Sequence, residues 1–405
     1  MVEIVNFTPY ANMRFSNLDA SGMEFGVFMA KVAFDIPFEG GMCRLSDEQE
    51  PFMLTDEYWG GLTESSLRYA SDLVPYKPTS DVTFDATAYA PNGEPARSWI
   101  IETAVEDAQG NRRSKRLRVT GPRFWVPQWK RALTDEEATE WRRYRHLFAG
   151  WELSEPEPIT SLDVRYEYAF GGWISMGTDD EGSPIVSAYE RNPVGRGWID
   201  WEWTDHTRPV PAPQIEDPDD PIVEPYAQYA PQGLGPMPAA WLPRREYGGT
   251  YDQHWIDHVW PRWAEDYNFR FHNCAHPDLQ TERYLTFPVR FTLRNMHPSY
   301  TVWSFTLPDR MLSLLVVGQD HPLTAPAFSL DLVHLEIGSA TIDDPRAYCV
   351  HRTPFDLSDA EQITLVERER NGLVVEFETL TPEAVACDPE LLDHRASVSL
   401  KNGGA

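Results

Sequence analysis

Alternation of apolar and polar residues, repeated along much of the chain, is the feature that most restricts its fold. From residue 283 onward the pattern is regular, with Leu285, Phe287, Val289, Phe291 and Leu293 at every second position. Side chains two residues apart share one face of a strand, so this spacing predicts strands with one buried face. Similar runs predict further strands at 82–88, 99–105, 117–119, 302–307, 311–317, 328–337, 363–366 and 373–380.

Three segments depart from this alternation. Residues 24–36 are apolar along their whole length, which predicts a strand covered on both faces. After residue 133, a capping Thr134 and three acidic residues predict a helix that buries Trp141, Tyr144 and Phe148 and ends at Gly150. Residues 173–248 combine Pro, Gly, acidic and aromatic residues and predict a long ordered loop.

These patterns predict a mainly β protein, made of antiparallel β-sandwich or barrel-like lobes with long ordered loops and a few short helices. A chain of 405 residues is long enough for two such units. We expect a β-rich region over residues 1–283, which contains the loop segment 173–248, and a second antiparallel β lobe over residues 284–405.

The charge balance restricts the class of partner. Sixty-three acidic and 35 basic residues give a formal net charge of −28, which repels nucleic acids and anionic membrane surfaces and attracts cationic proteins. The first residues show no basic start followed by an apolar run, and no window approaches the length of a membrane span. Four scattered cysteines fit a reducing compartment. We therefore expect an unexported, cytoplasmic protein.

Residues 249–280 resemble an active site because histidines, a cysteine and tryptophans lie among acidic residues. His254 and His258 have the spacing of a metal-binding pair on a helix, but Trp255 stands where a zinc protease needs its glutamate. On a strand, the alternating His272, Cys274 and His276 would point to one side. Neither metal pattern is complete, so we favour an aromatic packing role and expect no metal or other cofactor.

The rest of the chain carries no familiar catalytic signature. It has no nucleophile elbow, phosphate-binding loop or dinucleotide fingerprint. The acidic, proline-punctuated strap at 213–222 and the tryptophan-rich stretch are instead candidates for binding a partner protein. These candidate contact residues are Glu216, Asp217, Asp219, Asp220, Trp255, Trp260 and Trp263.

A series of separated motifs resembles one protein family. The series ends with the residues 278–280 and contains NFTPY (6–10), SDLVPYKPTSDV (71–82), GPRFW (121–125), YEYAFGG (166–172), RNPVGRGW (191–198), PQIEDPDDPI (213–222), GLGPMPAAWLPR (233–244) and GTYDQHW (249–255). In order and spacing these motifs resemble the bacterial domain-of-unknown-function family 2169, over roughly residues 3–295.

The resemblance implies a cytoplasmic accessory of type VI secretion, an adaptor or chaperone that holds an effector and helps to load it onto the spike. It implies no catalytic residues. Our hypothesis is therefore a non-enzymatic adaptor that binds the N-terminal or PAAR-proximal part of a secreted effector, and possible contacts with PAAR or spike proteins follow from it. Two alternatives remain open: an acidic immunity-type inhibitor of a basic toxin, and a metal-dependent hydrolase that uses Asp257 with the histidines and cysteine of 254–276.

Overall fold

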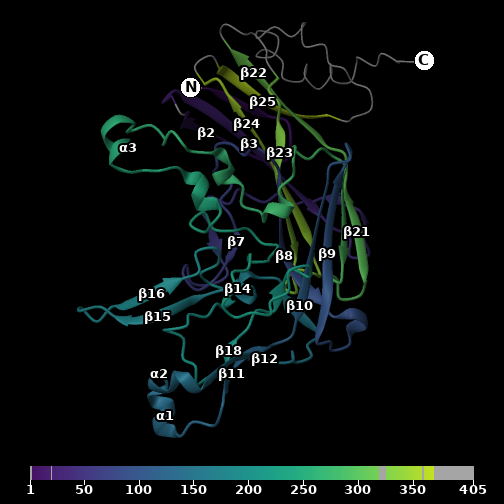
Figure 1. Ribbon diagram of the computed structural model, residues 1–405. Coiled ribbons are helices and arrows are strands. Elements are labelled where there is room, and N and C mark those ends of the chain that lie inside the picture. Colours follow the sequence, from purple (N-terminus) through teal and green to yellow (C-terminus); the bar gives the residue numbers. More distant parts are fainter. Residues whose placement is uncertain (1, 20, 319–324, 358–359, 369–405) are drawn as a thin grey trace.

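The computed structural model describes residues 2–19, 21–318, 325–357 and 360–368. Two large β-sheets lie against each other and form a sandwich, and three projections extend from one side of it (Figure 1). Mainly β architecture with a few short helices is thus confirmed. The strand predicted at 373–380 lies outside the described residues. No helix in the described ranges has the length and apolarity needed to cross a bilayer.

The first sheet has seven strands and is mixed rather than purely antiparallel. The parallel pair joins β8 to β23, and all other pairs in this sheet are antiparallel. The strands follow the order β13 (Ser161–Asp163), β8 (Asp81–Tyr89), β23 (Ser329–Ile337), β24 (Arg346–Phe355), β3 (Glu24–Asp35) and β2 (Ala11–Leu18), with β5 (Arg44–Leu45) also paired to β3.

The second sheet has six strands and covers one face of the first. Its order is β19 (Ile215–Glu216), β10 (Arg112–Thr120), β9 (Ser98–Asp107), β20 (Val289–Arg294), β21 (Val302–Leu307) and β4 (Gly41–Met42). A third, smaller sheet has three strands in the order β1 (Glu3–Asn6), β25 (Ala360–Arg368) and β22 (Met311–Gly318).

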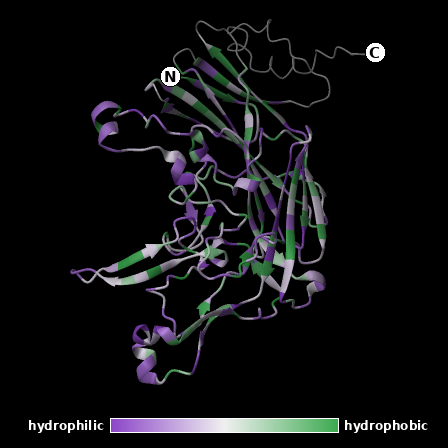
Figure 2. Ribbon diagram, viewed as in Figure 1, coloured by the Kyte–Doolittle hydropathy of each residue, from purple (hydrophilic) through white to green (hydrophobic). Residues whose placement is uncertain are grey.

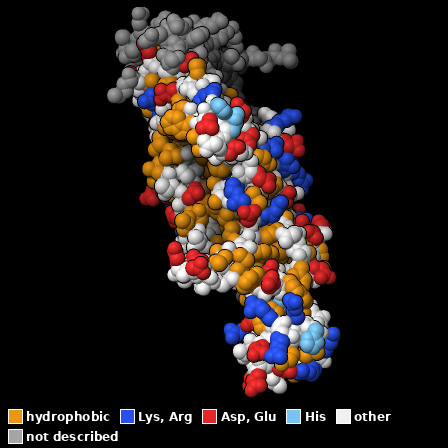
Figure 3. Space-filling model, turned by 60° about the vertical axis from the view of Figure 1, so that its left-hand side comes forward, with side chains coloured by type: hydrophobic (Ala, Val, Ile, Leu, Met, Phe, Trp, Pro, Cys, Tyr) orange, Lys and Arg blue, Asp and Glu red, His pale blue; other side chains and the backbone are white. Residues whose placement is uncertain are grey.

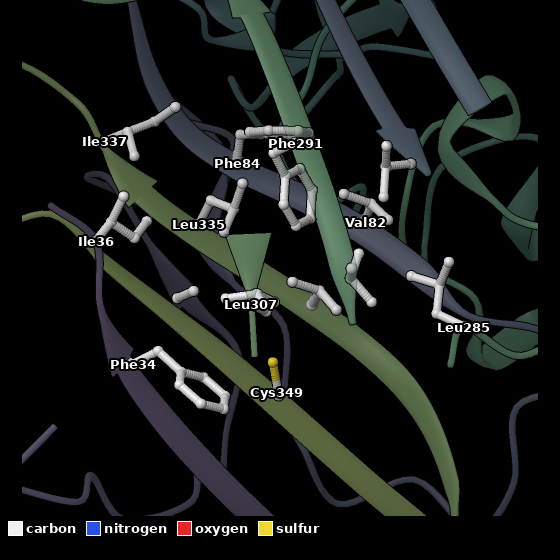
Figure 4. Packing of buried hydrophobic residues seen from close by; sticks show 14 of the residues in the cluster. Phe34, Ile36, Val82, Phe84, Leu285, Phe291, Leu307, Leu335, Ile337 and Cys349 are labelled. Atoms are coloured by element: carbon white, nitrogen blue, oxygen red, sulfur yellow. The ribbon is translucent and has the colours of Figure 1, made fainter. Parts of the chain in front are cut away.

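Alternate residues of both large sheets meet in one hydrophobic core, as the spacing in the sequence predicts. Phe84 of the first sheet meets Phe291 of the second edge to face, with ring centroids 6.5 Å apart (Figure 4). Phe291 also stacks on Phe305, with ring centroids 5.3 Å apart. Burying each such ring stabilises the fold by roughly 1.5–3 kcal/mol. Hydrophobic residues accordingly gather on the sandwich strands, whereas the short helices are largely hydrophilic (Figure 2).

Strand pairing crosses the predicted boundary at residue 283. β3 pairs with β24, β8 pairs with β23, and β9 pairs with β20. The strands after residue 284 therefore complete sheets that the earlier strands begin, instead of building a lobe of their own. Alternation identifies a strand and its buried face but contains no information about its neighbour, which is why the sequence did not reveal this arrangement.

The three projections contain the remaining elements that matter for function. The α1–α2 projection is built from β11 (Phe124–Trp129), β12 (Phe148–Leu153), β18 (Val210–Pro211), α1 (Asp135–Thr139) and α2 (Trp141–Tyr144). The β15–β16 ribbon is a two-stranded hairpin of β15 (Trp173–Thr178) and β16 (Pro184–Ala188). The α3 arm, residues 249–268, carries α3 (Gln253–His258).

Short pairs and turns complete the described chain. The strand pairs are β6 (Glu57–Tyr58) with β7 (Leu67–Tyr69) and β14 (Phe170–Gly171) with β17 (Arg196–Gly197). The 3-10 turns are Pro91–Gly93, Arg145–Leu147, Tyr166–Tyr168, Arg244–Gly248, Phe269–His272 and Pro277–Leu279.

The helix predicted after residue 133 is present but shorter than expected. The Thr134 hydroxyl accepts a hydrogen bond from the Glu137 amide, and the Thr134 amide donates one to the Glu137 carboxylate, which is a complete capping box. The helix breaks at Glu140, and Phe148 begins strand β12 rather than extending the helical face. Pairing of β12 with β11 overrides the local helical pattern.

A truncation tests whether residues 1–283 fold alone. Without β20, β23 and β24, the edges of β9, β8 and β3 lose their partners, and the core loses strands from both of its sheets. We expect this fragment to show no cooperative thermal transition by circular dichroism, whereas the full chain shows one. A fragment that melts cooperatively with near-UV signals of native packing would contradict the interleaved fold.

A buried histidine makes the stability of the fold dependent on pH. Burial lowers the pKa of His351 from 6.5 to about 3, and its ring lies against Phe287 and Phe328. Because the folded state disfavours the protonated ring, its contribution is complete above pH 6.5 and is lost as the pH falls toward 3. Between pH 7 and pH 4, we expect the wild type to lose about 3 kcal/mol more unfolding free energy than His351→Leu in urea titrations. Equal losses would exclude His351 as the titrating group.

Candidate functional site

The α3 arm places the first pair of candidate ligands on the surface. Asp252 caps α3 by accepting a hydrogen bond from the Trp255 amide at 3.0 Å. His254 and His258 then lie on one face with ring centroids 4.9 Å apart, as their spacing predicts, and both are exposed. Asp257 is occupied locally, because it accepts a hydrogen bond from Gln253 at 2.9 Å.

The second group of candidate ligands diverges instead of pointing to one side. Residues 269–279 form two 3-10 turns joined by a short extended stretch, not the strand that would align them. His272 lies 2.6 Å from the Tyr267 hydroxyl, Cys274 lies 3.9 Å from the Lys77 amine, and His276 lies 3.2 Å from the Lys115 amine. Each side chain therefore has a different neighbourhood.

This geometry gives the metal-site hypothesis no support. Within the described ranges, no three His, Cys, Asp or Glu side chains gather closely enough to hold a metal ion. Burial lowers the pKa of His272 to about 3, so this ring is neutral at physiological pH. Burial also raises the pKa of the Cys274 thiol to about 12, and a thiol that stays protonated is a poor nucleophile.

Cys274 belongs to a buried ionic layer between the seven-stranded sheet and the loops that cover its outer face. The Lys77 amine donates to Asp81 at 2.8 Å, Lys31 pairs with Asp72 at 3.3 Å, and Arg352 pairs with Asp331. Asp72, Lys77 and Asp81 all belong to the SDLVPYKPTSDV motif. The charged side chains of this motif therefore form ion pairs that hold loops to the sheet.

Asp81 ties the histidine-rich segment into the ionic layer. Its carboxylate accepts hydrogen bonds from the Asn273 side-chain amide at 3.0 Å and from the Cys274 backbone amide at 2.8 Å. The packing role favoured for residues 249–280 thus has a definite anchor at its C-terminal end, namely the contacts of residues 273 and 274 with Asp81.

The acidic strap is anchored by one of the residues expected to contact a partner. Glu216 is buried and accepts hydrogen bonds from Arg118 at 3.1 Å, Arg123 at 2.6 Å and the Ile222 amide at 3.0 Å. This corrects the expectation for Glu216, because a carboxylate with these partners is not available to another protein. Asp217 is half-buried, and only Asp219 and Asp220 of this group are exposed.

The three candidate tryptophans divide in a similar way. Trp255 is half-buried and donates its indole N–H to the Arg262 carbonyl at 2.8 Å. Trp263 is half-buried against Tyr267 and Phe269. Trp260 is 65% exposed and lies near the end of α3. Of the three, Trp260 is the one that presents most of its ring to a partner.

The sequence does not identify other exposed apolar residues as candidates, because they lie within residues 173–248, which are predicted to form a long loop. On the β15–β16 ribbon, Trp173 is 60% exposed and Val186 is 52% exposed. The alternation in WISMGT and PIVSA, on either side of an acidic turn, was the signal for this hairpin. Trp201 and Trp203 are two further exposed tryptophans, and both belong to the sequence WIDWEW at 198–203.

In the α1–α2 projection, Trp201 packs in an aromatic cluster around His206. The buried imidazole lies 4.4 Å from the Trp141 ring and 5.3 Å from the rings of Trp151 and Trp201. Burial lowers the pKa of His206, which favours the neutral form of its imidazole. Trp151 also donates its indole N–H to the hydroxyl of the exposed Tyr226 at 2.9 Å.

All three projections extend from the same side of the sandwich (Figure 1), and apolar side chains gather in patches among charged groups when the molecule is turned toward that side (Figure 3). We call this side the docking face and define it by nine exposed residues: Trp173, Ile185, Val186, Trp201, Trp203, Tyr226, Tyr251, Ile256 and Trp260. Exposed apolar groups of this number on one side of a protein are typical of a protein-binding surface.

Two clefts are lined neither by the docking residues nor by the candidate metal ligands. One, of about 340 Å³, crosses the outer face of the six-stranded sheet and is lined by Arg112, Arg290 and Glu106 among others. Another, of about 320 Å³, lies beside residues 270–282. Neither is lined by any of the five histidine and cysteine candidates, so these clefts do not rebuild the hypothetical hydrolase site.

Comparison with known proteins agrees with the motif series. The profile of a family described as "Uncharacterized protein conserved in bacteria (DUF2169)" matches residues 21–343. The chain belongs to the DUF2169 family. The match starts later than the motif series and extends further, so that it includes β20, β21 and β23 of the sandwich. No curated protein and no solved structure matches the chain.

The matched region of this DUF2169 protein includes the whole docking face and all of the ionic layer except Arg352. Asp72, Lys77 and Asp81 fall inside it, as do all nine residues of the docking face. The region that matches the family therefore contains two features. The charged residues of the motif are buried beneath the loops, and the exposed aromatic groups of the docking face lie at the surface.

A pair of variants tests whether the Lys77–Asp81 ion pair anchors the loops. Asp81→Asn keeps a hydrogen-bond acceptor but leaves the buried Lys77 amine without its carboxylate, and we expect it to lower the unfolding free energy by about 3–5 kcal/mol. Lys77→Met/Asp81→Asn should recover part of this loss in urea titrations. A double variant less stable than Asp81→Asn would contradict the role of the uncompensated charge.

Proposed function

We propose that this DUF2169 protein is a non-enzymatic adaptor or chaperone that acts in the bacterial cytoplasm. It binds a secreted type VI effector through the N-terminal or PAAR-proximal segment of that effector and assists its loading onto the spike. Family membership and the motif series support this role. The observation that carries the binding function is the docking face, where three projections expose tryptophan and aliphatic side chains on one side.

Aromatic anchors suit this function physically. Tryptophan and tyrosine supply much of the energy in protein interfaces, and their few rotatable bonds limit the entropy lost on binding. Trp201 is additionally held by its contacts with Phe148 and His206. A partner that covers such residues gains apolar contact without first ordering the adaptor surface.

The net charge determines which partner approaches quickly. A charge of −28 accelerates encounter with a basic segment at low ionic strength, and salt screens this attraction over about 10 Å at 0.1 M. Binding would cover apolar surface on the effector until the adaptor is displaced at the spike or carried to it.

Co-expression with the effector encoded by the neighbouring gene tests the adaptor function. We expect a complex that survives purification, and a loss of effector stability or secretion when the adaptor gene is deleted. Failure to form a complex, together with unchanged effector stability and secretion, would refute the proposal. Rescue from effector toxicity without any secretion defect would instead favour an immunity-type inhibitor.

Matched variants test whether the docking face makes the contact. Trp173→Ala, Trp201→Ala and Trp260→Ala should each weaken effector binding roughly tenfold, as expected for interface anchors. Val302→Ala is the control, because Val302 is 49% exposed but belongs to β21 of the six-stranded sheet. Calorimetric titration should also show weaker binding at higher salt. Equal affinities for the tryptophan variants and the control would place the contact elsewhere.

A further inference from the structure

The β15–β16 ribbon is a sheet with two unused edges. β15 and β16 pair only with each other among the described strands, and a two-stranded hairpin is marginally stable in water. Its base is held by Ile174, which is buried. Beyond this base the ribbon extends away from the sandwich (Figure 1).

The hydrogen-bond pattern shows which backbone groups are free. Tyr189 donates its amide to the Gly172 carbonyl at 2.9 Å, so the opposing pair Gly172–Tyr189 is hydrogen-bonded. Because such pairs alternate along an antiparallel ladder, the N–H and C=O groups of Trp173, Ser175 and Val186 point outward. The described residues provide no backbone or side-chain partner for these outward groups.

The two edges are not equivalent. The register shifts between Ser175 and Thr178, which inserts an extra residue into β15, and Gly177 adopts a positive φ of 110° there. Such a bulge interrupts the regular spacing of the β15 edge. β16 contains no extra residue, so its edge offers the more regular row of donors and acceptors.

Side chains beside this edge are apolar and exposed. The register places Val186 opposite Ser175 and Ala188 opposite Trp173, so Val186 and Trp173 share one face of the ribbon. Both are more than half exposed. A strand added to β16 would cover Val186 and gain cross-strand contacts in addition to backbone hydrogen bonds.

The turn at the end of the ribbon adds a charge preference. Asp179 organises this turn by accepting hydrogen bonds from the amides of Glu181 at 3.0 Å and Ser183 at 2.8 Å. Asp180 and Glu181 are exposed, and within the described ranges no ion pair joins a Lys or Arg to either of them. The turn therefore presents uncompensated negative charge next to the open edge of β16.

We propose that the β16 edge captures one extended, cationic segment of the partner protein as a third strand. This inference rests on the proposed adaptor function and specifies the kind of segment that the adaptor binds. The segment alternates β-branched or aromatic residues with Lys or Arg. Its backbone pairs with Val186 and Ala188, its apolar side chains cover Val186 and Trp173, and its charges meet Asp180 and Glu181.

Proline variants test the edge directly. The probe is a fluorescein-labelled ten-residue peptide of alternating valine and lysine, and binding is measured by fluorescence anisotropy. Val186→Pro removes an outward N–H from β16, whereas Ser175→Pro removes an outward N–H from β15 and is the matched control. We expect at least tenfold weaker binding for Val186→Pro and unchanged binding for Ser175→Pro. Equal affinities for the wild type and Val186→Pro would overturn the proposal.

Charge and folding are controlled separately. Asp180→Asn/Glu181→Gln should weaken binding and reduce its salt dependence, and this variant keeps Asp179, which holds the turn. A valine–glutamate peptide should bind at least tenfold more weakly than the valine–lysine peptide, and equal binding would overturn the charge assignment. Should Val186→Pro lose the wild-type melting curve, Val186→Lys replaces it, because a lysine on the edge repels the cationic strand and must also weaken binding.

The cognate effector separates this inference from the adaptor function. If Val186→Pro captures the effector as well as the wild type does, the adaptor function stands and the β16 edge is not its contact. If the wild type binds the peptide but captures no effector, the strand-binding edge stands and the adaptor function falls. Protection of the Val186 and Ala188 amides from hydrogen exchange when peptide is bound supports strand addition, and unchanged exchange overturns it.

Discussion

The structure depends on covering both faces of the seven-stranded sheet, one face with a second sheet and the other with loops. The second sheet covers one face and requires only apolar contacts, such as Phe84 against Phe291. Loops cover the other face, and loops bring backbone amides and carbonyls that must find partners once they are buried. The ion pairs Lys77–Asp81, Lys31–Asp72 and Arg352–Asp331 lie at this second interface because a purely apolar face would leave those groups unsatisfied.

These ion pairs are better understood as devices that fix loop position than as sources of stability. Burying two charges costs nearly as much as their attraction returns, but leaving one charge unpaired is far worse, so only one loop arrangement is tolerated. Asp81 illustrates this, because it contacts Lys77, Asn273 and Cys274 together. The segment that leads back from the α3 arm is thereby held in place.

The features of the fold that the sequence predicts are those that depend on residues close together in the chain. Alternation at 82–88 and 289–293 gave the strands and their buried faces correctly, since period-two burial is local. The sequence does not predict the pairing between β8 and β23, because the two strands are far apart in the chain. The alternation of His272, Cys274 and His276 would align these side chains only on a strand, whereas residues 269–279 form two 3-10 turns, and Asn273 and Cys274 donate hydrogen bonds to Asp81. The ribbon was missed because surrounding prolines and glycines concealed two short alternating runs.

Charge and apolar contact act at different stages of binding by such a surface. Long-range attraction by an acidic protein raises the rate of encounter and is screened by salt, whereas the lifetime of a complex follows from desolvated contacts such as those of Trp173 or Trp260. A partner recruited by charge can therefore remain bound after the charges are screened. In the proposed adaptor function, release of the partner would then require competition for the apolar contacts themselves. Because these contacts lie on separate projections, they could be broken one at a time.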